Sequence, residues 1–194
     1  MSIISGKQIV EAINSGDITI SPYFEKYVNP ISYDLRLGEK YAFYANCVNY
    51  INKAEENFTP TGYILDCKKE EPIVIQDIPE SGLVMVPGIG YLMHTLESVS
   101  TEKYVPILDG KSSVGRLFIQ IHSTAGLGDP GFSGQFTLEV MVTHKIRVYK
   151  GMRIGQVRFF EISGEHENYQ NTGHYNGVNA IGPVASQLWR SFNE

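Results

Sequence analysis

The residues best suited to chemistry lie between Asp109 and Glu139. A turn at Gly110 is followed by a lysine, two serines and an arginine within the six residues 111–116. Hydroxyl groups, cations and backbone N–H groups in a tight turn suit the binding of a phosphate ester. A second polar turn contains Asp129, and Glu139 follows ten residues later on a mostly apolar segment. A carboxylate in that setting suits acid–base chemistry, so the stretch predicts a site for a phosphorylated substrate.

Three familiar enzyme signatures are absent from this stretch. Gly110-Lys111-Ser112 looks like the end of a P-loop, but residue 105 is valine where that pattern needs glycine. No Gly-x-Ser-x-Gly elbow surrounds Ser112 or Ser113, which argues against a serine nucleophile. The His-x-Glu and Pro-Cys-x-x-Cys signature of zinc deaminases is also missing. If the chain deaminates a base, we expect it to do so without zinc.

The motifs, taken in order, resemble those of the dCTP deaminase branch of the dUTPase superfamily. The likeness is carried by residues 32–38, 110–116, 122–126, 129–134, 137–139 and 151–156, and it covers most of the chain. It implies an all-β fold, a distorted jelly-roll-like barrel with a short N-terminal helix. It also implies a single domain over residues 1–194, with a closing tail at about 163–194, and a homotrimer with its sites at subunit interfaces.

The resemblance implies hydrolytic deamination of dCTP to dUTP and ammonia. Glu139 would take a proton from a water that attacks C4 of cytosine, then deliver protons to N3 and to the leaving ammonia. Ser112 and Arg116 would position Glu139, the water and the pyrimidine. The backbone carbonyl of Ala125 would hold the water or the exocyclic amine. Mg²⁺ would be bound through the nucleotide phosphates, with no metal site of the protein's own.

A wider set of substrate contacts follows from the same resemblance. Lys111, Ser113 and Arg116 would face the triphosphate together with Gln156, and Asp129 would bind the sugar 3′-hydroxyl. The remaining implied contacts are Ser112, Val114, Gly115, Thr137, Leu138, Glu139, Tyr169, His174 and Tyr175. The tail departs from the family pattern, because His174 replaces a lysine and Val178 stands where a glutamine is usual. This departure affects the expected binding of the phosphates by the tail and does not involve Glu139.

Other readings of Glu139 remain open. It could be a structural carboxylate paired with a cation, since ion-paired carboxylates are common in folded proteins. In plain dUTPases an apolar residue occupies its place, so a glutamate favours a deaminase. A bifunctional enzyme that releases dUMP and pyrophosphate is a first alternative, and a plain dUTPase is another. A nucleotide-binding regulator without turnover is a further alternative, from a non-enzymatic class.

Composition narrows the class of protein. The chain has 194 residues, of which 42% are hydrophobic and 19% charged, and its 19 glycines favour a turn-rich β protein. A net charge of −5 argues against a nucleic-acid polymer as partner. The two cysteines, Cys47 and Cys67, form no Cys-x-x-Cys pair. No apolar run approaches 18 residues, so we expect a cytoplasmic protein without a membrane span.

Local patterns predict several elements. Ser5 and Gln8 have the spacing of a capping box, and Gly16 should end the helix that they begin. Residues 32–38 alternate like a strand with Asp34 and Arg36 on one face, paired with charged neighbours.

Further strands are expected at 117–121 and 135–140. The segments 83–86 and 91–93, separated by Pro87-Gly88, read as a hairpin. His94 precedes Glu97 by three residues. This pair could form a metal site only on a helix, and the segment looks extended, so a structural role for His94 is predicted.

Overall fold

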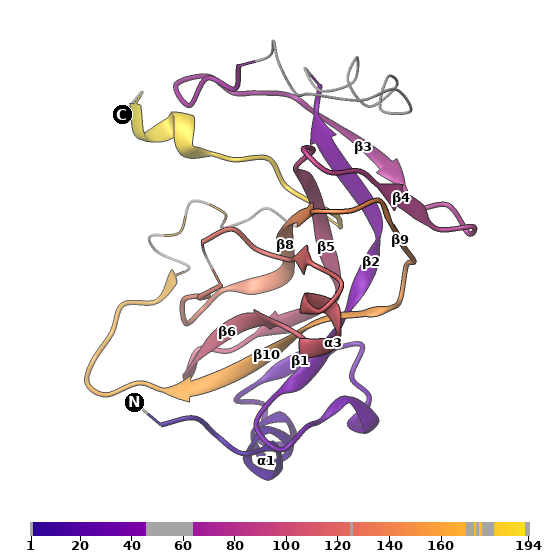
Figure 1. Ribbon diagram of the computed structural model, residues 1–194. Coiled ribbons are helices and arrows are strands. Elements are labelled where there is room, and N and C mark those ends of the chain that lie inside the picture. The colour runs from indigo at the N-terminus through magenta and orange to yellow at the C-terminus, as the bar shows by residue number, and fades with distance from the viewer. Residues whose placement is uncertain are drawn as a thin grey trace.

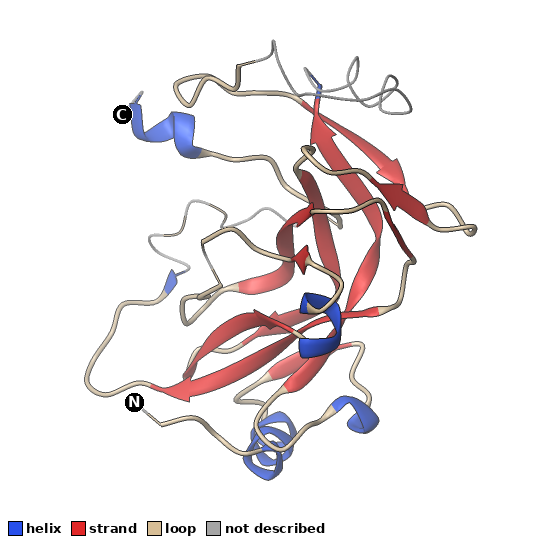
Figure 2. Cartoon of the chain, in the orientation of Figure 1, coloured by secondary structure: helices blue, strands red, loops and turns tan. Residues whose placement is uncertain are grey.

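The structure, a computed structural model, describes residues 2–45, 64–124, 126–169, 173, 175 and 181–192. Figures 1 and 2 show a fold built mainly of strands, with short helical segments at its edges. The helical elements are α1 (Gly6–Ser15), η1 (Glu25–Tyr27), α3 (Ser112–Gly115) and η3 (Leu188–Phe192). The strands are β1 (Thr19–Ser21), β2 (Tyr33–Tyr44), β3 (Ile73–Asp77), β4 (Leu83–Met85), β5 (Tyr91–Ser100), β6 (Tyr104–Gly110), β7 (Ile119–Gln120), β8 (Ser133–Val142), β9 (Ile146–Val148) and β10 (Arg153–Glu161).

Helix α1 has the ends that its sequence predicts. The Ser5 side chain accepts a hydrogen bond from the Gln8 backbone N–H, and the Gln8 side chain accepts one from the Ser5 N–H. Gly16 adopts a left-handed conformation with φ 83° and closes the C-terminus. Ile9 and Ala12 bury the apolar face of the helix. Both the capping box and the short N-terminal helix are therefore confirmed, and α1 covers one end of the sheet (Figure 1).

Within the described part of the chain, eight strands form one antiparallel sheet. Its order is β6-β10-β2-β5-β8-β7, with β1 also paired to β5 and β3 to β2. The sheet curls into a barrel-like shape around a core to which β2 contributes Tyr33, Leu35 and Leu37. The predicted all-β fold is confirmed. No helix in the described ranges combines the length and the apolar composition that crossing a bilayer requires.

The predicted hairpin between 83–86 and 91–93 is wrong. Strand β4 pairs with β9 in a separate two-stranded sheet, where Leu83 lies opposite Val148 and Met85 opposite Ile146. Strand β5 instead pairs with β2 on one side and β8 on the other. The long central strand takes two long neighbours, and this non-local pairing overrides the turn at Pro87-Gly88.

The predicted strand at 117–121 is only partly correct. Residues Ser112–Gly115 form a single helical turn, and only Ile119–Gln120 are extended. Between them Phe118 has a φ of 56°, which is unusual for a bulky residue. Val114 and Ile119 are buried while Leu117 and Phe118 are exposed. The apolar run 117–121 therefore begins in a turn, and its first two side chains do not show the alternating burial expected of a strand.

The polar residues inside the sheet are paired. Arg36 Nε lies 2.6 Å from Glu97 Oε1, and Asp34 pairs with Lys111, so the ion pairs predicted for 32–38 are present. His94 is 2% exposed. Its Nε2 accepts the Lys40 N–H at 3.1 Å, and its Nδ1 lies 2.9 Å from the Thr95 carbonyl. Burial lowers the pKa of this imidazole. The predicted structural role of His94 is confirmed.

Candidate functional site

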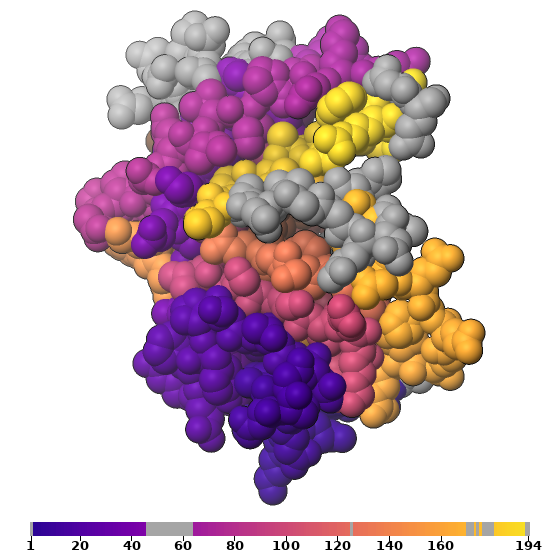
Figure 3. Space-filling model, turned by 180° about the vertical axis from the view of Figure 1, so that it is seen from behind, coloured from indigo at the N-terminus to yellow at the C-terminus, as the bar shows by residue number. Residues whose placement is uncertain are grey.

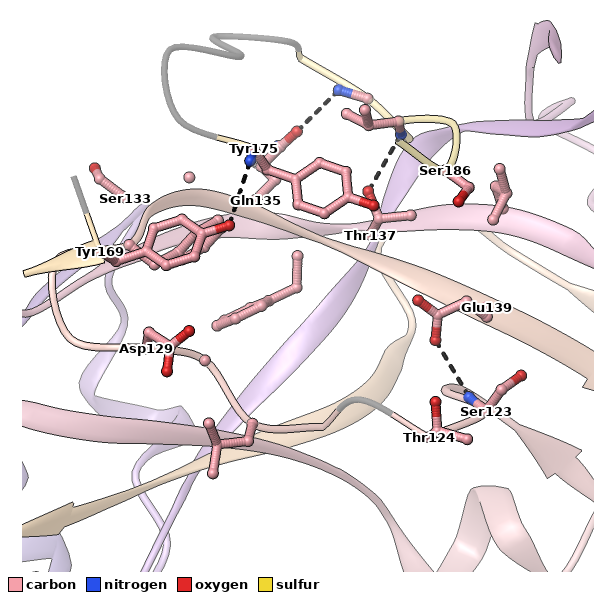
Figure 4. Close-up of a pocket in the computed structure, with 18 of the residues that line it drawn as sticks. Ser123, Thr124, Asp129, Ser133, Gln135, Thr137, Glu139, Tyr169, Tyr175 and Ser186 are labelled. Atoms are coloured by element: carbon pink, nitrogen blue, oxygen red, sulfur yellow. Dashed lines mark hydrogen bonds between the residues drawn. The ribbon is translucent and has the colours of Figure 1, made fainter. Parts of the chain in front are cut away.

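A pocket of about 480 Å³ opens beside strand β8. Its walls come from β8, from the turns between β7 and β8, and from the C-terminal segment (Figure 4). The lining residues are Tyr44, Leu92, Ser123, Thr124, Leu127, Gly128, Asp129, Phe132, Ser133, Gly134, Gln135, Phe136, Thr137, Glu139, Tyr169, Tyr175, Gly182, Val184 and Ser186. From behind, the C-terminal segment (yellow) crosses the surface beside β8 (Figure 3).

Strand alternation decides which side chains reach the pocket from residues 137–140 of β8. Successive side chains of a strand point to opposite faces. Gln135, Thr137 and Glu139 therefore line the pocket, whereas Leu138 and Val140 are fully buried in the core. The side chain of Leu138, one of the implied substrate contacts, points away from the pocket.

Glu139 is half-buried and directed at a backbone donor. Its Oε2 accepts a hydrogen bond from the Ser123 N–H at 3.2 Å (Figure 4). Within the described part of the chain it forms no salt bridge, in contrast to Asp34 and Glu97. The carboxylate therefore does not serve as the partner of a described structural cation. One oxygen is oriented by Ser123, and the side chain borders the space where a ligand would lie.

An aromatic wall stands beside Asp129. The rings of Phe132 and Phe136 stack with centroids 5.1 Å apart, and Tyr169 meets Phe132 edge-on at 6.1 Å. The Tyr169 N–H donates to the Pro130 carbonyl at 2.9 Å, which joins the start of the tail to the Asp129 turn. Burial raises the pKa of the Tyr169 phenol, and the nearby Asp129 carboxylate adds to the rise. The phenol therefore stays protonated at neutral pH and can donate a hydrogen bond.

The C-terminal segment is held over the pocket by three side-chain oxygens. Gln135 Oε1 accepts the N–H of Gly182 at 3.1 Å, and Thr137 Oγ1 accepts that of Val184 at 3.2 Å. Tyr44 OH accepts the N–H of Ser186 at 3.3 Å. Figure 4 shows the first two bonds above the Glu139 side chain. The segment at 182–186 thus forms one wall of the pocket.

Apart from the buried Leu138, the described site residues that were predicted fall into two groups. The first, Asp129, Thr137, Glu139, Tyr169 and Tyr175, lines the pocket. The second, made up of 111–116 and Gln156, does not line it. Ala125 and His174 lie outside the described residues.

The second group occupies the region of α3. Ser112, Ser113, Gly115 and Arg116 are exposed, and Val114 is buried in the core. Lys111 pairs with Asp34. The Gln156 amide is engaged twice: its Nε2 donates to the Gly110 carbonyl, and its Oε1 accepts from Ser32 Oγ, both at 2.8 Å.

The described lining of the pocket is acidic. It contains the carboxylates of Asp129 and Glu139 and no lysine, arginine or histidine. The exposed cation of the predicted site, Arg116, lies in the second group. For an anionic ligand to be held here, cations must be brought to the pocket from outside its described walls.

Several lining residues were not predicted. Gln135 could have been found, because it lies two residues before Thr137 on the same strand face. Ser123 and Thr124 lie within the motif at 122–126, but their place in it does not indicate a role. Tyr44 and Ser186 come from segments far from β8 in the sequence, and no local pattern connects them with it.

The fold belongs to a known class. The structure matches a crystal structure of 2′-deoxycytidine 5′-triphosphate deaminase from Agrobacterium tumefaciens with a TM-score of 0.59 at 20% identity. The match covers 88% of this chain and 53% of that one, so this chain spans about half the length of the Agrobacterium chain. At this identity the likeness shows the fold alone, and that fold is all-β.

The sequence then defines the family. Residues 3–162 match the family model described as dCTP deaminase-like, and the chain belongs to this family. It is 41% identical over 192 residues to "dCTP deaminase, dUMP-forming" of Leptospira biflexa, with 99% of each chain covered. It is also 40% identical over 190 residues to the protein of the same name from Clostridium acetobutylicum, with 98% of each covered.

Proposed function

We propose that the protein is a dCTP deaminase that forms dUMP. The observation that carries the proposal is Glu139, a carboxylate without a described cation partner, oriented by the Ser123 N–H and facing a pocket. The names of the Leptospira and Clostridium relatives, which match along nearly the whole chain, support the dUMP-forming activity over a simple deaminase. This was the first alternative that the sequence left open.

In the proposed mechanism Glu139 acts as the proton shuttle. It accepts a proton from a water molecule, whose oxygen attacks C4 of cytosine and forms a tetrahedral centre. The carboxyl group then protonates N3. Glu139 next takes the proton of the new C4 hydroxyl and passes it to the amino group, so that the C4–N bond breaks, ammonia leaves and the C4 carbonyl of uracil forms. The Ser123 N–H holds the carboxylate oriented during these transfers, a positioning effect on which general acid–base catalysis depends. A second water then attacks the α-phosphorus of the resulting dUTP, which forms dUMP and releases pyrophosphate.

Asp129 and the aromatic wall suit the nucleoside part of the substrate. The Asp129 carboxylate can accept a hydrogen bond from the sugar 3′-hydroxyl, and the faces of Phe132 and Phe136 offer an apolar surface beside it. Tyr169, which stays protonated at neutral pH, can donate to a phosphate oxygen. These residues come from one chain and surround one pocket.

The phosphates need cations, and the described lining of this pocket contains none. We therefore propose that the active form is a homotrimer in which Ser112 and Arg116 of one chain complete the pocket of its neighbour. Ser112 is exposed on α3, Arg116 is exposed directly after it, and neither lines the pocket of its own chain. Such an arrangement would unite the two groups of predicted site residues.

Mg²⁺ would accompany the nucleotide. Among the described residues no group of three His, Cys, Asp or Glu side chains could hold an ion by itself. We propose that phosphate oxygens and water supply its ligands, where it neutralises charge on the triphosphate. We also propose that the protein is cytoplasmic, a location that fits a nucleotide substrate.

A product assay with Glu139→Gln tests the function. The wild-type protein, incubated with dCTP and Mg²⁺, should release ammonia and accumulate dUMP. The variant keeps the shape of the side chain but loses its capacity as a base. Its deamination rate should fall by about 10²–10⁴-fold, the range typical of general acid–base catalysis. Glu102→Gln, on an exposed loop, is the matched control and should retain wild-type activity.

The outcomes separate the alternatives. Accumulation of dUTP without dUMP in the wild type would indicate a simple deaminase. Formation of dUMP from dUTP but not from dCTP would indicate a plain dUTPase. Near-normal deamination by Glu139→Gln would remove Glu139 from the mechanism. Nucleotide binding without any turnover would support a regulatory protein.

A further inference from the structure

A buried carboxylate lies behind the turn that carries Ser112 and Arg116. Asp34 on β2 is 1% exposed. Its Oδ1 accepts hydrogen bonds from Lys111 Nζ and from Asn29 Nδ2, the latter at 2.7 Å, and its Oδ2 accepts one from Arg153 Nη1 at 3.3 Å. A buried charge requires a counter-charge and hydrogen bonds. Lys111, with a side chain 19% exposed against 60% for Arg153, is the better shielded of the two cations.

Lys111 is also the first residue of the turn. Its carbonyl accepts the N–H groups of Val114 at 2.9 Å and Gly115 at 2.8 Å. The same residue is therefore attached to the sheet through its side chain and to the α3 backbone through its carbonyl. On the other side, Gln156 holds the Gly110 carbonyl at 2.8 Å. Residues 110 and 111 are thus both attached to side chains that belong to the sheet.

The turn needs these attachments, because a helix of four residues has almost no stability of its own. Val114 is the one buried side chain within α3, and Ser112, Ser113 and Gly115 are exposed. We propose that Asp34 is a positioning residue for the reaction: through Lys111 it fixes the turn so that Ser112 and Arg116 are presented in one orientation. The consequence for turnover rests on the proposed function, whereas the attachment itself does not.

The competing role for Lys111 is a direct contact with phosphate, and the two roles predict opposite results for Asp34→Asn. This variant keeps the shape of Asp34 and removes its charge. If Lys111 serves as the attachment, Asp34→Asn and Lys111→Met should each lower kcat for dCTP deamination by about tenfold, and the double variant should be no worse than either. If Lys111 binds phosphate, Asp34→Asn would free it, and affinity for the triphosphate would stay equal or rise.

Hydrogen exchange on the nucleotide-free protein tests the attachment without any assay of activity. The N–H groups of Val114, Gly115 and Arg116 are hydrogen-bonded within the turn. In Asp34→Asn and in Lys111→Met, peptides covering 110–118 should exchange about tenfold faster than in the wild type. Arg153→Gln is the matched control, because it removes the other cation from the same carboxylate without touching the turn. It should exchange there like the wild type and keep wild-type kcat.

Each result decides the question. Wild-type exchange in 110–118 of both Asp34→Asn and Lys111→Met would overturn the proposal, as would multiplicative losses of kcat in the double variant. If Asp34→Asn does not fold, Lys111→Met alone provides the exchange comparison, since it leaves Asp34 bonded to Asn29 and Arg153. If the wild type does not deaminate dCTP, the proposed function fails, and the exchange rates still decide whether Asp34 fixes the turn.

Discussion

Removing the hydroxyl group of Thr137 should release the C-terminal segment from the pocket and weaken nucleotide binding. Thr137 Oγ1 accepts the Val184 N–H at 3.2 Å, between the bonds that Gln135 and Tyr44 make to Gly182 and Ser186. Thr137→Val replaces the hydroxyl with a methyl group of similar size, so the shape of the pocket wall is kept. Thr137→Ser retains the hydroxyl and serves as the matched control.

The size of the effect follows from one hydrogen bond. A neutral hydrogen bond contributes roughly 0.5–1.5 kcal/mol net, and a value of about 1 kcal/mol corresponds to about a fivefold change in an equilibrium constant. Val184 is half-buried, so water can only partly replace the lost acceptor. If docking of the segment accompanies nucleotide binding, the Kd of Thr137→Val should rise by about fivefold. Thr137→Ser should stay close to the wild type.

Calorimetric titration with dCTP and Mg²⁺ measures this effect, with Glu139→Gln included in every protein to prevent turnover. The titrations are repeated on chains that end at Gly182 and so lack the Val184 donor. In the shortened chain Thr137→Val should have no further effect, because the two changes remove the same bond. An equal loss in the long and short chains would mean that the hydroxyl contacts the nucleotide directly and would refute the reasoning. Tighter binding by Thr137→Val would show that the segment obstructs the pocket.

Two further predictions concern stability and assembly. Burial holds the pKa of His94 below its ordinary value of 6.5, so the unfolded chain takes up a proton first as pH falls. The stability that His94 contributes is therefore complete above pH 6.5 and is lost as pH falls toward the lowered pKa. Urea titrations should show that the free energy of unfolding differs less between about pH 7.5 and about pH 5.5 in His94→Gln than in the wild type. If neighbouring chains share a site, Glu139→Gln and Arg116→Ala should each be inactive alone and regain part of the activity when co-expressed in one oligomer. A mixed oligomer as inactive as its parents, or a fully active monomer by light scattering, would contradict site sharing.

The parts of the fold that sequence predicted well depend on residues close together in the chain. Ser5, Gln8 and Gly16 specify the ends of α1 within about three turns of helix. The hairpin prediction failed because the partner of β4 lies in 146–148, some sixty residues later. A turn dipeptide such as Pro87-Gly88 is compatible with either pairing, and only the assembled sheet selects between them.

In the candidate site, too, the features that sequence predicts are those that depend on residues close together in the chain. Alternation along one strand places Thr137 and Glu139 on a common face, and both line the pocket. The engagement of Lys111 by Asp34 and of Gln156 by Gly110 depends on pairing between β2, β10 and β6, which no local pattern reveals. Tyr44 reaches the pocket for a similar reason, from the far end of β2.

The charge of the described pocket lining supports the proposed sharing of a site between two chains. The described lining of the pocket carries two carboxylates and no cation, while the proposed substrate brings a triphosphate with several negative charges. Negative charges within a few ångströms of one another repel, and this repulsion costs free energy unless cations lie between them. Lys111 already serves as the counter-charge of Asp34. Arg116 is therefore the exposed cation of the 110–116 motif that remains available to the phosphates. The order of motifs along the sequence is compatible with a site in one chain or between two, but Arg116 is exposed directly after α3 and does not line its own pocket. The charge of the pocket favours the site between two.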